Sequence, residues 1–341
     1  MYTGAEARRG PRGDEGRETA PRRPQRGRRH PLLAALCALV LAGLTVPLAV
    51  RAAGADGVTP VPQLLAFLPW FLAPTWLALL GAALARRPLL LVWGLAVLAT
   101  TGWFLQPYGP PAPDGAQDRA AKARFRVLTA NLEYGGALPD LLDTVRRERP
   151  QVVSVQECDR ACAATLRGPE LREAYPHRVI AGGDGADGSA LLSRYPLSDK
   201  SEVPSRLAMP GAVATIGGER VRLQVAHPMP PDLGELGPWR TELGRLRDFA
   251  AEGGLPTVIA GDFNASADHA VFRALLDTGL HDTARQLGHS RTPTWPAGAA
   301  PPLGAQIDHV LVSDHLVPME AEFLDFEGTD HRALLVDVKL F

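Results

Sequence analysis

The stretch VIAGDFNASAD, residues 258–268, joins an apolar run to a group of polar side chains. The run is typical of a buried strand, and Gly261-Asp262-Phe263-Asn264 ends it. Because successive side chains of an extended chain point to opposite sides, Asp262 and Asn264 share one side. Strand ends are positions where a rigid scaffold presents reactive groups, but a strand followed by an Asx-type turn gives the same pattern.

Other apolar runs of strand type end in the same way. Each polar residue at such an end has an ordinary explanation, as a solvated strand end or a surface histidine. Their joint occurrence indicates one functional site at a common edge of a sheet. The eight candidate residues are Asn131, Glu157, His227, Asp262, Asn264, Asp308, Asp330 and His331.

These residues lie within motifs that occur in the order of a known family. The motifs are LTANLEYG (128–135), VVSVQE (152–157), LLSRYPL (191–197), VAHP (225–228), VIAGDFNA (258–265), PTWP (293–296), QIDHVLVS (306–313) and GTDHRALLVDV (328–338). Together they resemble the endonuclease/exonuclease/phosphatase (DNase I-like) superfamily over roughly residues 125–341. The resemblance implies an α+β fold, a four-layer α/β/β/α sandwich with the site at one edge of two packed sheets.

The same resemblance implies a divalent metal. A phosphate ester is anionic, so a carboxylate-lined site repels it unless a cation intervenes. Oxygen ligands suit Mg²⁺ or Mn²⁺. Glu157 matches the family's main metal carboxylate, and Asn131 and Asp330 match residues that contact the metal directly or through its ligands.

The remaining candidates match the family's catalytic groups. Asp262 matches the carboxylate that orients or deprotonates the attacking water, and Asn264 the amide that holds this water and a phosphate oxygen. His331, paired with Asp308, matches the catalytic histidine that is cationic beside the developing phosphorane. His227 would contact a phosphate oxygen or the leaving group. Whether Asp262 or His331 is the general base stays open.

Ahead of this domain the composition changes twice. Residues 1–30 hold nine Arg against four acidic residues and little apolar surface, which is typical of disorder. The next segment is strongly apolar and predicts three transmembrane helices. The predicted divisions are a basic cytoplasmic tail (1–30), membrane helices (about 32–50, 61–85 and 88–106 within 31–107), a linker (108–123) and a metal-dependent phosphohydrolase domain (124–341).

The positive charges predict the orientation. The Arg-rich tail and Arg86-Arg87 belong on the cytoplasmic side, so three crossings place the catalytic domain outside the cytoplasm. A buried helical hairpin of a soluble protein is an alternative. A cleaved signal peptide would explain only the first apolar run. A lipoprotein anchor fits poorly, because Cys37 lies at the start of that run.

Two further cysteines lie in the predicted outer domain. Cys158 and Cys162 lack the second pair of a zinc site. In an oxidising compartment they can form a disulfide, and two unpaired small apolar residues are an equally good interpretation.

The charge and length of the domain argue against a nuclease. From residue 108 onward the chain has 24 Lys and Arg against 32 Asp and Glu, a net charge of −8. Proteins that bind nucleic acid through its phosphates usually present a basic face. Glu157 is followed by Cys158-Asp159-Arg160, not by the Thr-Lys found in abasic-site endonucleases. The short segment between His227 and Asp262 leaves little room for DNA-gripping loops.

The sequence therefore predicts a multi-pass membrane protein with a divalent-metal-dependent hydrolase domain outside the cytoplasm. The expected bond is a phosphoester or pyrophosphate, and the expected partners are membrane lipids and a phosphorylated, lipid-linked substrate, not nucleic acid. The domain order is similar to that of teicoplanin-resistance membrane proteins, which implies a connection with glycopeptide resistance. The alternatives are an extracytoplasmic nuclease or phosphodiesterase and a non-catalytic membrane-tethered binding module.

Overall fold

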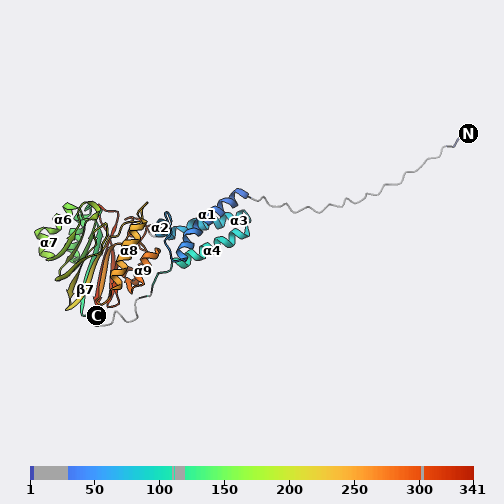
Figure 1. Ribbon diagram of the computed structural model, residues 1–341. Coiled ribbons are helices and arrows are strands. Elements are labelled where there is room, and N and C mark those ends of the chain that lie inside the picture. Colours follow the sequence, from blue (N-terminus) through green and yellow to red (C-terminus); the bar gives the residue numbers. More distant parts are fainter. Residues whose placement is uncertain (4–29, 110, 112–119, 301–302) are drawn as a thin grey trace.

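The computed structural model describes residues 1–3, 30–109, 111, 120–300 and 303–341. Most of the predicted basic tail and of the predicted linker lies outside these residues. Figure 1 shows a domain built around β-sheets, from which a bundle of helices projects. The chain passes through the bundle first, so the order of the two parts agrees with the composition of the sequence.

Two six-stranded sheets form the centre of the domain. The first has the order β11-β12-β1-β2-β4-β3, with β1 at Ala123–Asn131, β2 at Val152–Gln156, β3 at His177–Ala181, β4 at Ser189–Ser193, β11 at Leu316–Asp325 and β12 at Arg332–Leu340. The second has the order β5-β6-β7-β8-β10-β9, with β5 at Leu197–Glu202, β6 at Pro210–Ile216, β7 at Glu219–Ala226, β8 at Thr257–Asp262, β9 at Leu280–Asp282 and β10 at Asp308–Ser313.

Helices cover the outer face of each sheet. Side chains such as Val127 and Val258 form the core between the sheets. On the first sheet lie α5 (Leu138–Glu148), α6 (Arg160–Arg167) and α7 (Pro169–Ala174), and on the second lie α8 (Leu236–Ala251) and α9 (Ala270–Leu276). Two short elements, η2 (Gly185–Asp187) and α10 (Thr283–Gln286), complete the domain. The predicted α+β class and its layers α/β/β/α are confirmed.

The strand pairing brings the ends of distant runs to one rim. β1 and β2 are parallel with Asn131 opposite Gln156, and β7 and β8 are parallel with Ala226 opposite Gly261. The residues that follow β2 and β7 therefore emerge beside the ends of β1 and β8. β10 runs antiparallel to β8, with its first residue, Asp308, opposite Asp262.

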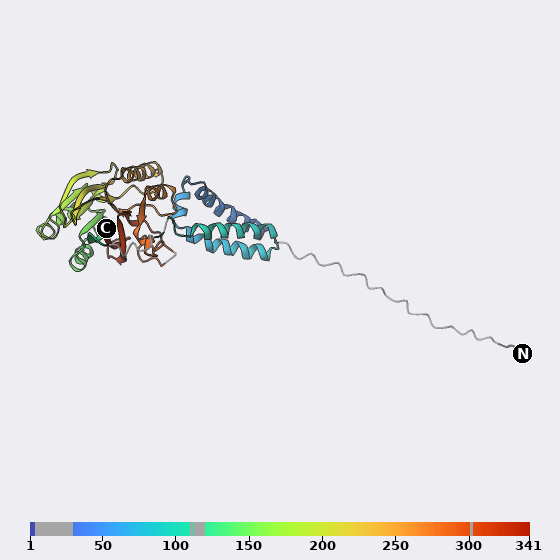
Figure 2. The same cartoon turned by 90° about the horizontal axis from the view of Figure 1, so that it is seen from below.

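The N-terminal helices pack against one another through Cys37, Leu41, Ala78 and Val97. They are α1 (Pro31–Ala52), α2 (Val61–Ala66), η1 (Leu68–Phe71), α3 (Leu72–Leu84) and α4 (Pro88–Phe104). Figure 2 shows the long helices extending side by side away from the sheets.

The prediction of three membrane-spanning helices is not supported. Within the described ranges only α1, with 22 residues, is long and apolar enough to cross a membrane. The expected span 61–85 is divided at Phe67, because α2 turns aside to pack on the domain. α4 has 17 residues and a length of about 26 Å, against a hydrocarbon core of about 30 Å.

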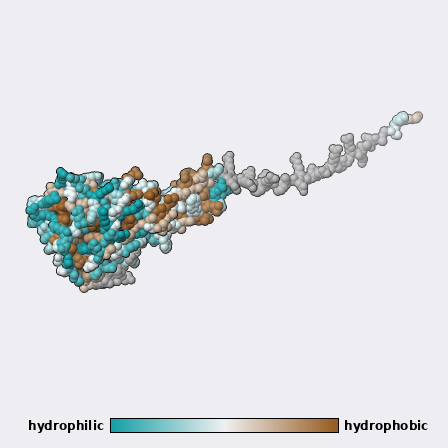
Figure 3. Space-filling view, in the orientation of Figure 1, coloured by the Kyte–Doolittle hydropathy of each residue, from teal (hydrophilic) through white to brown (hydrophobic). Residues whose placement is uncertain are grey.

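α1 is not a core helix of the kind that soluble proteins bury. Only 22% of its most apolar window is buried. Large apolar side chains such as Leu39, Leu77 and Leu95 are exposed on the bundle, which is largely brown in Figure 3. A helix of this composition near the N-terminus can be a membrane anchor or a signal sequence.

Candidate active site

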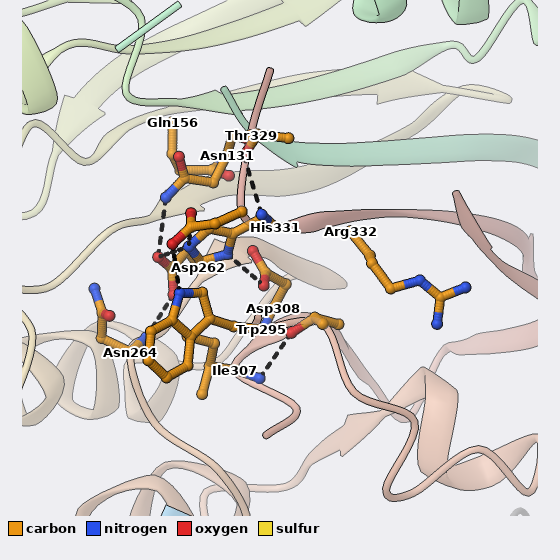
Figure 4. A network of polar contacts seen from close by, with 12 residues as sticks. Asn131, Gln156, Asp262, Asn264, Trp295, Ile307, Asp308, Thr329, His331 and Arg332 are labelled. Carbon is orange, nitrogen blue, oxygen red and sulfur yellow. Dashed lines mark hydrogen bonds and ion pairs between the residues drawn. The ribbon is translucent and has the colours of Figure 1, made fainter. Parts of the chain in front are cut away.

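One amide joins carboxylates from the two sheets. The Nδ2 of Asn131, at the end of β1, donates to Glu157 Oε1 and to Asp262 Oδ2, each at 3.1 Å. Its Oδ1 accepts a hydrogen bond from the backbone N–H of Glu133 at 3.0 Å, which orients the amide. Asp262 Oδ1 accepts from the backbone N–H of Asn264 at 2.8 Å. Figure 4 shows Asn131, Asp262 and Asn264 gathered at this rim.

The backbone is turned sharply where these side chains emerge. Glu157 and Asn264 have φ angles of 52° and 47°, in the left-handed region that few residues other than glycine adopt. Such conformations concentrate at sites where the surrounding structure fixes a side-chain direction. Cys158, directly after Glu157, forms a disulfide with Cys162, so the disulfide interpretation is the one that the structure supports.

A histidine–aspartate pair lies beside the carboxylates. His331 Nδ1 is 2.9 Å from Asp308 Oδ2. Its Nε2 is 3.8 Å from Asp262 Oδ2 and 3.7 Å from Asp330 Oδ1, too far for hydrogen bonds. Burial lowers the pKa of His331, but the charges of Asp308 and Asp262 outweigh burial and raise it to about 10. The imidazole is therefore cationic at neutral pH.

The carboxylates carry negative charge that the protein does not fully balance. Burial, assisted by the charge of Asp308, raises the pKa of Asp262 to about 7. Burial also raises the pKa of Glu157. Asp308 Oδ1 is buried without a hydrogen-bond partner in the described part of the chain. A divalent cation fits this donor set, since it would bind the oxygens and neutralise their charge.

One group of side chains in the described ranges has the geometry of a metal site. Donor atoms of Asp262, Asp308 and His331 lie within 4.8 Å of one another. This group differs from the predicted ligands Asn131, Glu157 and Asp330. Because His331 and Asp308 are already hydrogen-bonded to each other, the half-buried Glu157 is the better candidate for the main ligand, and its assignment stays a prediction.

His227 follows β7 and is buried next to Glu157, with 3.9 Å between its Nε2 and Glu157 Oε1. Burial, and then the positive charge of His331, lower its pKa to about 3. His227 is therefore neutral at physiological pH. Its Nδ1 is buried and has no hydrogen-bond partner among the described residues.

Asp330 and Asn264 border the same space. Asp330 is half exposed, and its Oδ2 accepts a hydrogen bond from the indole N–H of Trp295 at 2.7 Å. Asn264 donates through Nδ2 to the carbonyl of Pro228 at 3.0 Å.

A pocket of about 550 Å³ opens at this rim. Six of the eight predicted residues line it, whereas Asn131 and Asp308 lie behind and hold Asp262 and His331. The structure thus brings all eight together. Sequence reasoning assigned no role to other lining residues, which include Gln63, Ala66, Phe67, Glu133, Tyr134, Met229, Trp295 and Ile307.

Some of the missed residues carried a signal. Glu133, Tyr134 and Trp295 lie inside motifs of the family resemblance. Gln63, Ala66 and Phe67 lie in an apolar run that was assigned to the membrane, so only the three-dimensional arrangement reveals their place in the pocket.

Two packed sheets with carboxylates, an amide and a histidine–aspartate pair at one rim define a class of metal-assisted phosphoester hydrolases. Residues 128–331 match the model of the Endonuclease/Exonuclease/phosphatase family, and the chain belongs to this family. No curated protein sequence matches the chain.

Solved structures share the fold at low sequence identity. Danio rerio TDP2 in complex with a single-strand DNA product is 14% identical (TM-score 0.52; 63% of this chain, 98% of that chain). An endonuclease/exonuclease/phosphatase from Beutenbergia cavernae is 21% identical (TM-score 0.52; 64% and 72%). The 3′ phosphatase NExo from Neisseria, bound to a product DNA hairpin, is 21% identical (TM-score 0.50; 62% and 98%). Similarity at this level shows the fold alone.

The DNA in two of these structures is at odds with the prediction that nucleic acid is not a substrate. The acidic balance of the domain concerns the whole surface and does not decide what one pocket binds.

Proposed function

We propose that the chain is a divalent-metal-dependent hydrolase of phosphoester or pyrophosphate bonds. The observation that carries this proposal is the bridge from Glu157 through Asn131 to Asp262, with the cationic His331 beside Asp262. Positioning and charge neutralisation are the main requirements of phosphoryl transfer, and this arrangement supplies groups for both.

Each residue of the site has a proposed role in the reaction. Mg²⁺ or Mn²⁺, held by Glu157 with help from Asp262, would neutralise the phosphate and position it. Asp262, with a pKa of about 7, can accept the proton of an attacking water at neutral pH. Asn264 is placed to orient this water. His331, held in one tautomer by Asp308, stabilises negative charge on the phosphoryl oxygens, and neutral His227 can donate a hydrogen bond to one of them.

We further propose that the bundle attaches the enzyme to a membrane and that the domain lies outside the cytoplasm, acting on a phosphorylated, lipid-linked or membrane-surface substrate. Nine Arg residues lie within residues 1–30, ahead of α1, the helix that is long and apolar enough to cross a membrane. Positive residues favour the cytoplasmic side. The Cys158–Cys162 disulfide supports an oxidising compartment for the domain. The connection with glycopeptide resistance stays a prediction from the resemblance.

A nuclease or phosphodiesterase is the second candidate, because two structures of similar fold contain DNA product. A phosphate-release and nicking screen of the purified full chain distinguishes the two. It covers polyprenyl diphosphates, phospholipids, sugar phosphates and plasmid DNA with Mg²⁺ and Mn²⁺. We expect hydrolysis that His331→Ala abolishes. Failure to hydrolyse any substrate with either metal would favour a non-catalytic binding module.

A further inference from the structure

The pocket that holds the catalytic residues is completed by the N-terminal segment. Gln63 and Ala66 of α2, together with Phe67, line the same space as Asp262 and His331. The segment that connects α1 to the other bundle helices therefore forms part of the substrate site.

Buried polar contacts fix this segment on the domain. Arg51, near the end of α1, bonds through Nε to Asp268 Oδ1 at 3.1 Å, and Arg291 bonds to Asp268 Oδ2 at 2.7 Å. The carboxylate of Asp56 accepts the backbone N–H groups of Ala270 at 2.6 Å and Val271 at 3.2 Å, at the start of α9. These contacts place the loop after α1 directly on the catalytic domain.

α2 itself is held by His269. The backbone N–H of Ser266 donates to His269 Nδ1 at 2.9 Å, so Nδ1 is an acceptor and the ring proton is on Nε2. Nε2 lies 2.8 Å from the carbonyl oxygen of Pro62 and donates to it. The side-chain amide of Gln63 donates to the carbonyl of Pro231. The wall formed by α2 is thus a built part of the pocket.

An apolar surface lies next to the catalytic groups. The rings of Phe67 and Trp295 pack with 6.0 Å between their centroids. The indole N–H of Trp295 in turn donates to Asp330, beside His331. Ala66, Leu207, Met229, Pro230 and Ile307 add further apolar lining.

The charge of the lining limits the substrate. Among the described residues that line this pocket there is no Lys or Arg, whereas Glu133, Glu157, Asp232, Asp262 and Asp330 are acidic. Divalent cations can balance one phosphate or diphosphate against such a lining. A polyanion would place further phosphates along a lining whose described residues include no Lys or Arg, so the electrostatic attraction that dominates nucleic-acid binding would be weak there.

A second aromatic ring lies next to Phe67 on the side of the N-terminal helices. The ring of Trp70, in η1, is 5.5 Å from that of Phe67, and Trp70 is 52% exposed. A hydrocarbon chain that leaves the pocket past Phe67 would therefore meet the ring of Trp70.

Building on the proposed function, we propose that Phe67, with Trp295 and Met229, selects a phosphate or diphosphate ester of a long aliphatic alcohol. The phosphate lies at Asp262 and His331, and the aliphatic chain runs past Phe67 toward the N-terminal helices.

The test uses the full chain with n-alkyl phosphates and n-alkyl diphosphates from ethyl to decyl, and with plasmid DNA. We expect kcat/KM of the wild-type protein to rise with chain length, by up to about fourfold for each buried methylene. Phe67→Ala should flatten this rise, because it should lower kcat/KM for the decyl esters much more than for the ethyl esters. The matched control, Leu84→Ala, changes an exposed apolar residue at the end of α3, outside the pocket, and should preserve the rise.

Phe67→Trp keeps an aromatic ring and should shift the preference to shorter chains, which a misfolded protein could not do. Three results would overturn the proposal: rates that do not depend on chain length, a Phe67→Ala effect that is equal for every ester, or a higher kcat/KM for plasmid DNA than for decyl esters. Each leaves the proposed hydrolase intact. If no ester and no DNA were hydrolysed with either metal, the proposed function itself would fail, and this proposal with it.

Discussion

Two histidine–aspartate pairs meet at the start of β10, and they differ in what they face. Asp308 bonds to His331 at 2.9 Å, and the next residue of the strand, His309, bonds through Nδ1 to Asp282 at 2.8 Å. All four side chains are buried. By residue type and distance the two pairs are nearly the same.

The two pairs differ in the surroundings of the second ring nitrogen, Nε2, of each histidine. His309 Nε2 lies 3.1 Å from the carbonyl oxygen of Ala265, and the ring packs against Phe263 and Phe272. His331 Nε2 lies beyond hydrogen-bond distance of Asp262, and the residue lines the pocket. His331 shares its pocket with Glu157 and Asp262, whereas His309 does not line that pocket. This difference, more than the composition of the pair, makes His331 the candidate catalytic histidine.

Removal of divalent cations should give the largest effect. It should stop hydrolysis in the pocket of His331 and leave the fold around the His309 pair unchanged. We expect excess EDTA to reduce hydrolysis to the rate without enzyme, because Asp262 and Glu157 would then repel the phosphate. The His309 pair lies apart from the pocket, so circular dichroism should show a folded protein. Full hydrolysis in EDTA would contradict a metal-assisted site.

Replacing each histidine in turn sharpens the contrast. We expect His331→Ala to lower kcat of the folded fraction by roughly 10²–10⁴-fold. His309→Ala should keep kcat of the folded fraction within a few-fold, but lower the free energy of unfolding by about 2–4 kcal/mol through lost packing and hydrogen bonds. Steady-state kinetics and urea unfolding measure both, and the reverse assignment would refute the distinction.

Replacing Glu157 should weaken metal binding more than it disturbs the His331–Asp308 pair. We expect Glu157→Gln to raise the Mg²⁺ concentration for half-maximal rate by roughly 10–100-fold, since the amide removes a charge from the cation's surroundings. Glu170→Gln, a change at an exposed position of α7, serves as the matched control. An unchanged Mg²⁺ dependence in Glu157→Gln would exclude Glu157 as a ligand.

The pH profile should show the smallest but most specific effect. kcat/KM should rise as Asp262 loses its proton, near pH 7, and fall as His331 loses its proton, near pH 10. Bound cations lower the pKa of Asp262, so more metal should move the acid limb to lower pH.

Because Asp308 raises the pKa of His331, Asp308→Asn should move the alkaline limb to lower pH by about one unit or more. Asp282→Asn should leave both limbs in place. If only Asp282→Asn moved the alkaline limb, that limb would belong to His309 and not to His331, which would contradict the assignment.

The sequence predicted the strands that form the rim, but it did not predict β5 or α8. The rim strands were predictable because a buried strand must be apolar, and each of them is an apolar run. They are β1, β2, β7, β8, β10 and β12. β5, with the sequence LSDKSE, is an almost fully exposed edge strand that shows no alternation. α8 buries Trp239, Leu243 and Leu246, but Gly237, Pro238 and Gly244 in the same segment weaken its helical signal.

The eight candidate residues were predictable as a group because carboxylates, amides and histidines at strand ends stand out from the apolar runs before them. Phe67 was not, because an apolar side chain has the same pattern whether it faces lipid, a core or a pocket. The same ambiguity explains the overestimated number of membrane helices, since residues 61–66 face the domain and contribute nothing to a spanning length.

The most direct test of the account is an anomalous difference map from crystals of the full chain grown with Mn²⁺. The account predicts a peak in the pocket with the Glu157 carboxylate among the ligands, and with Asp262, Asn264 and His331 around it. A map in which Mn²⁺ binds elsewhere on the chain, leaving Glu157 and Asp262 without an ion, would contradict it.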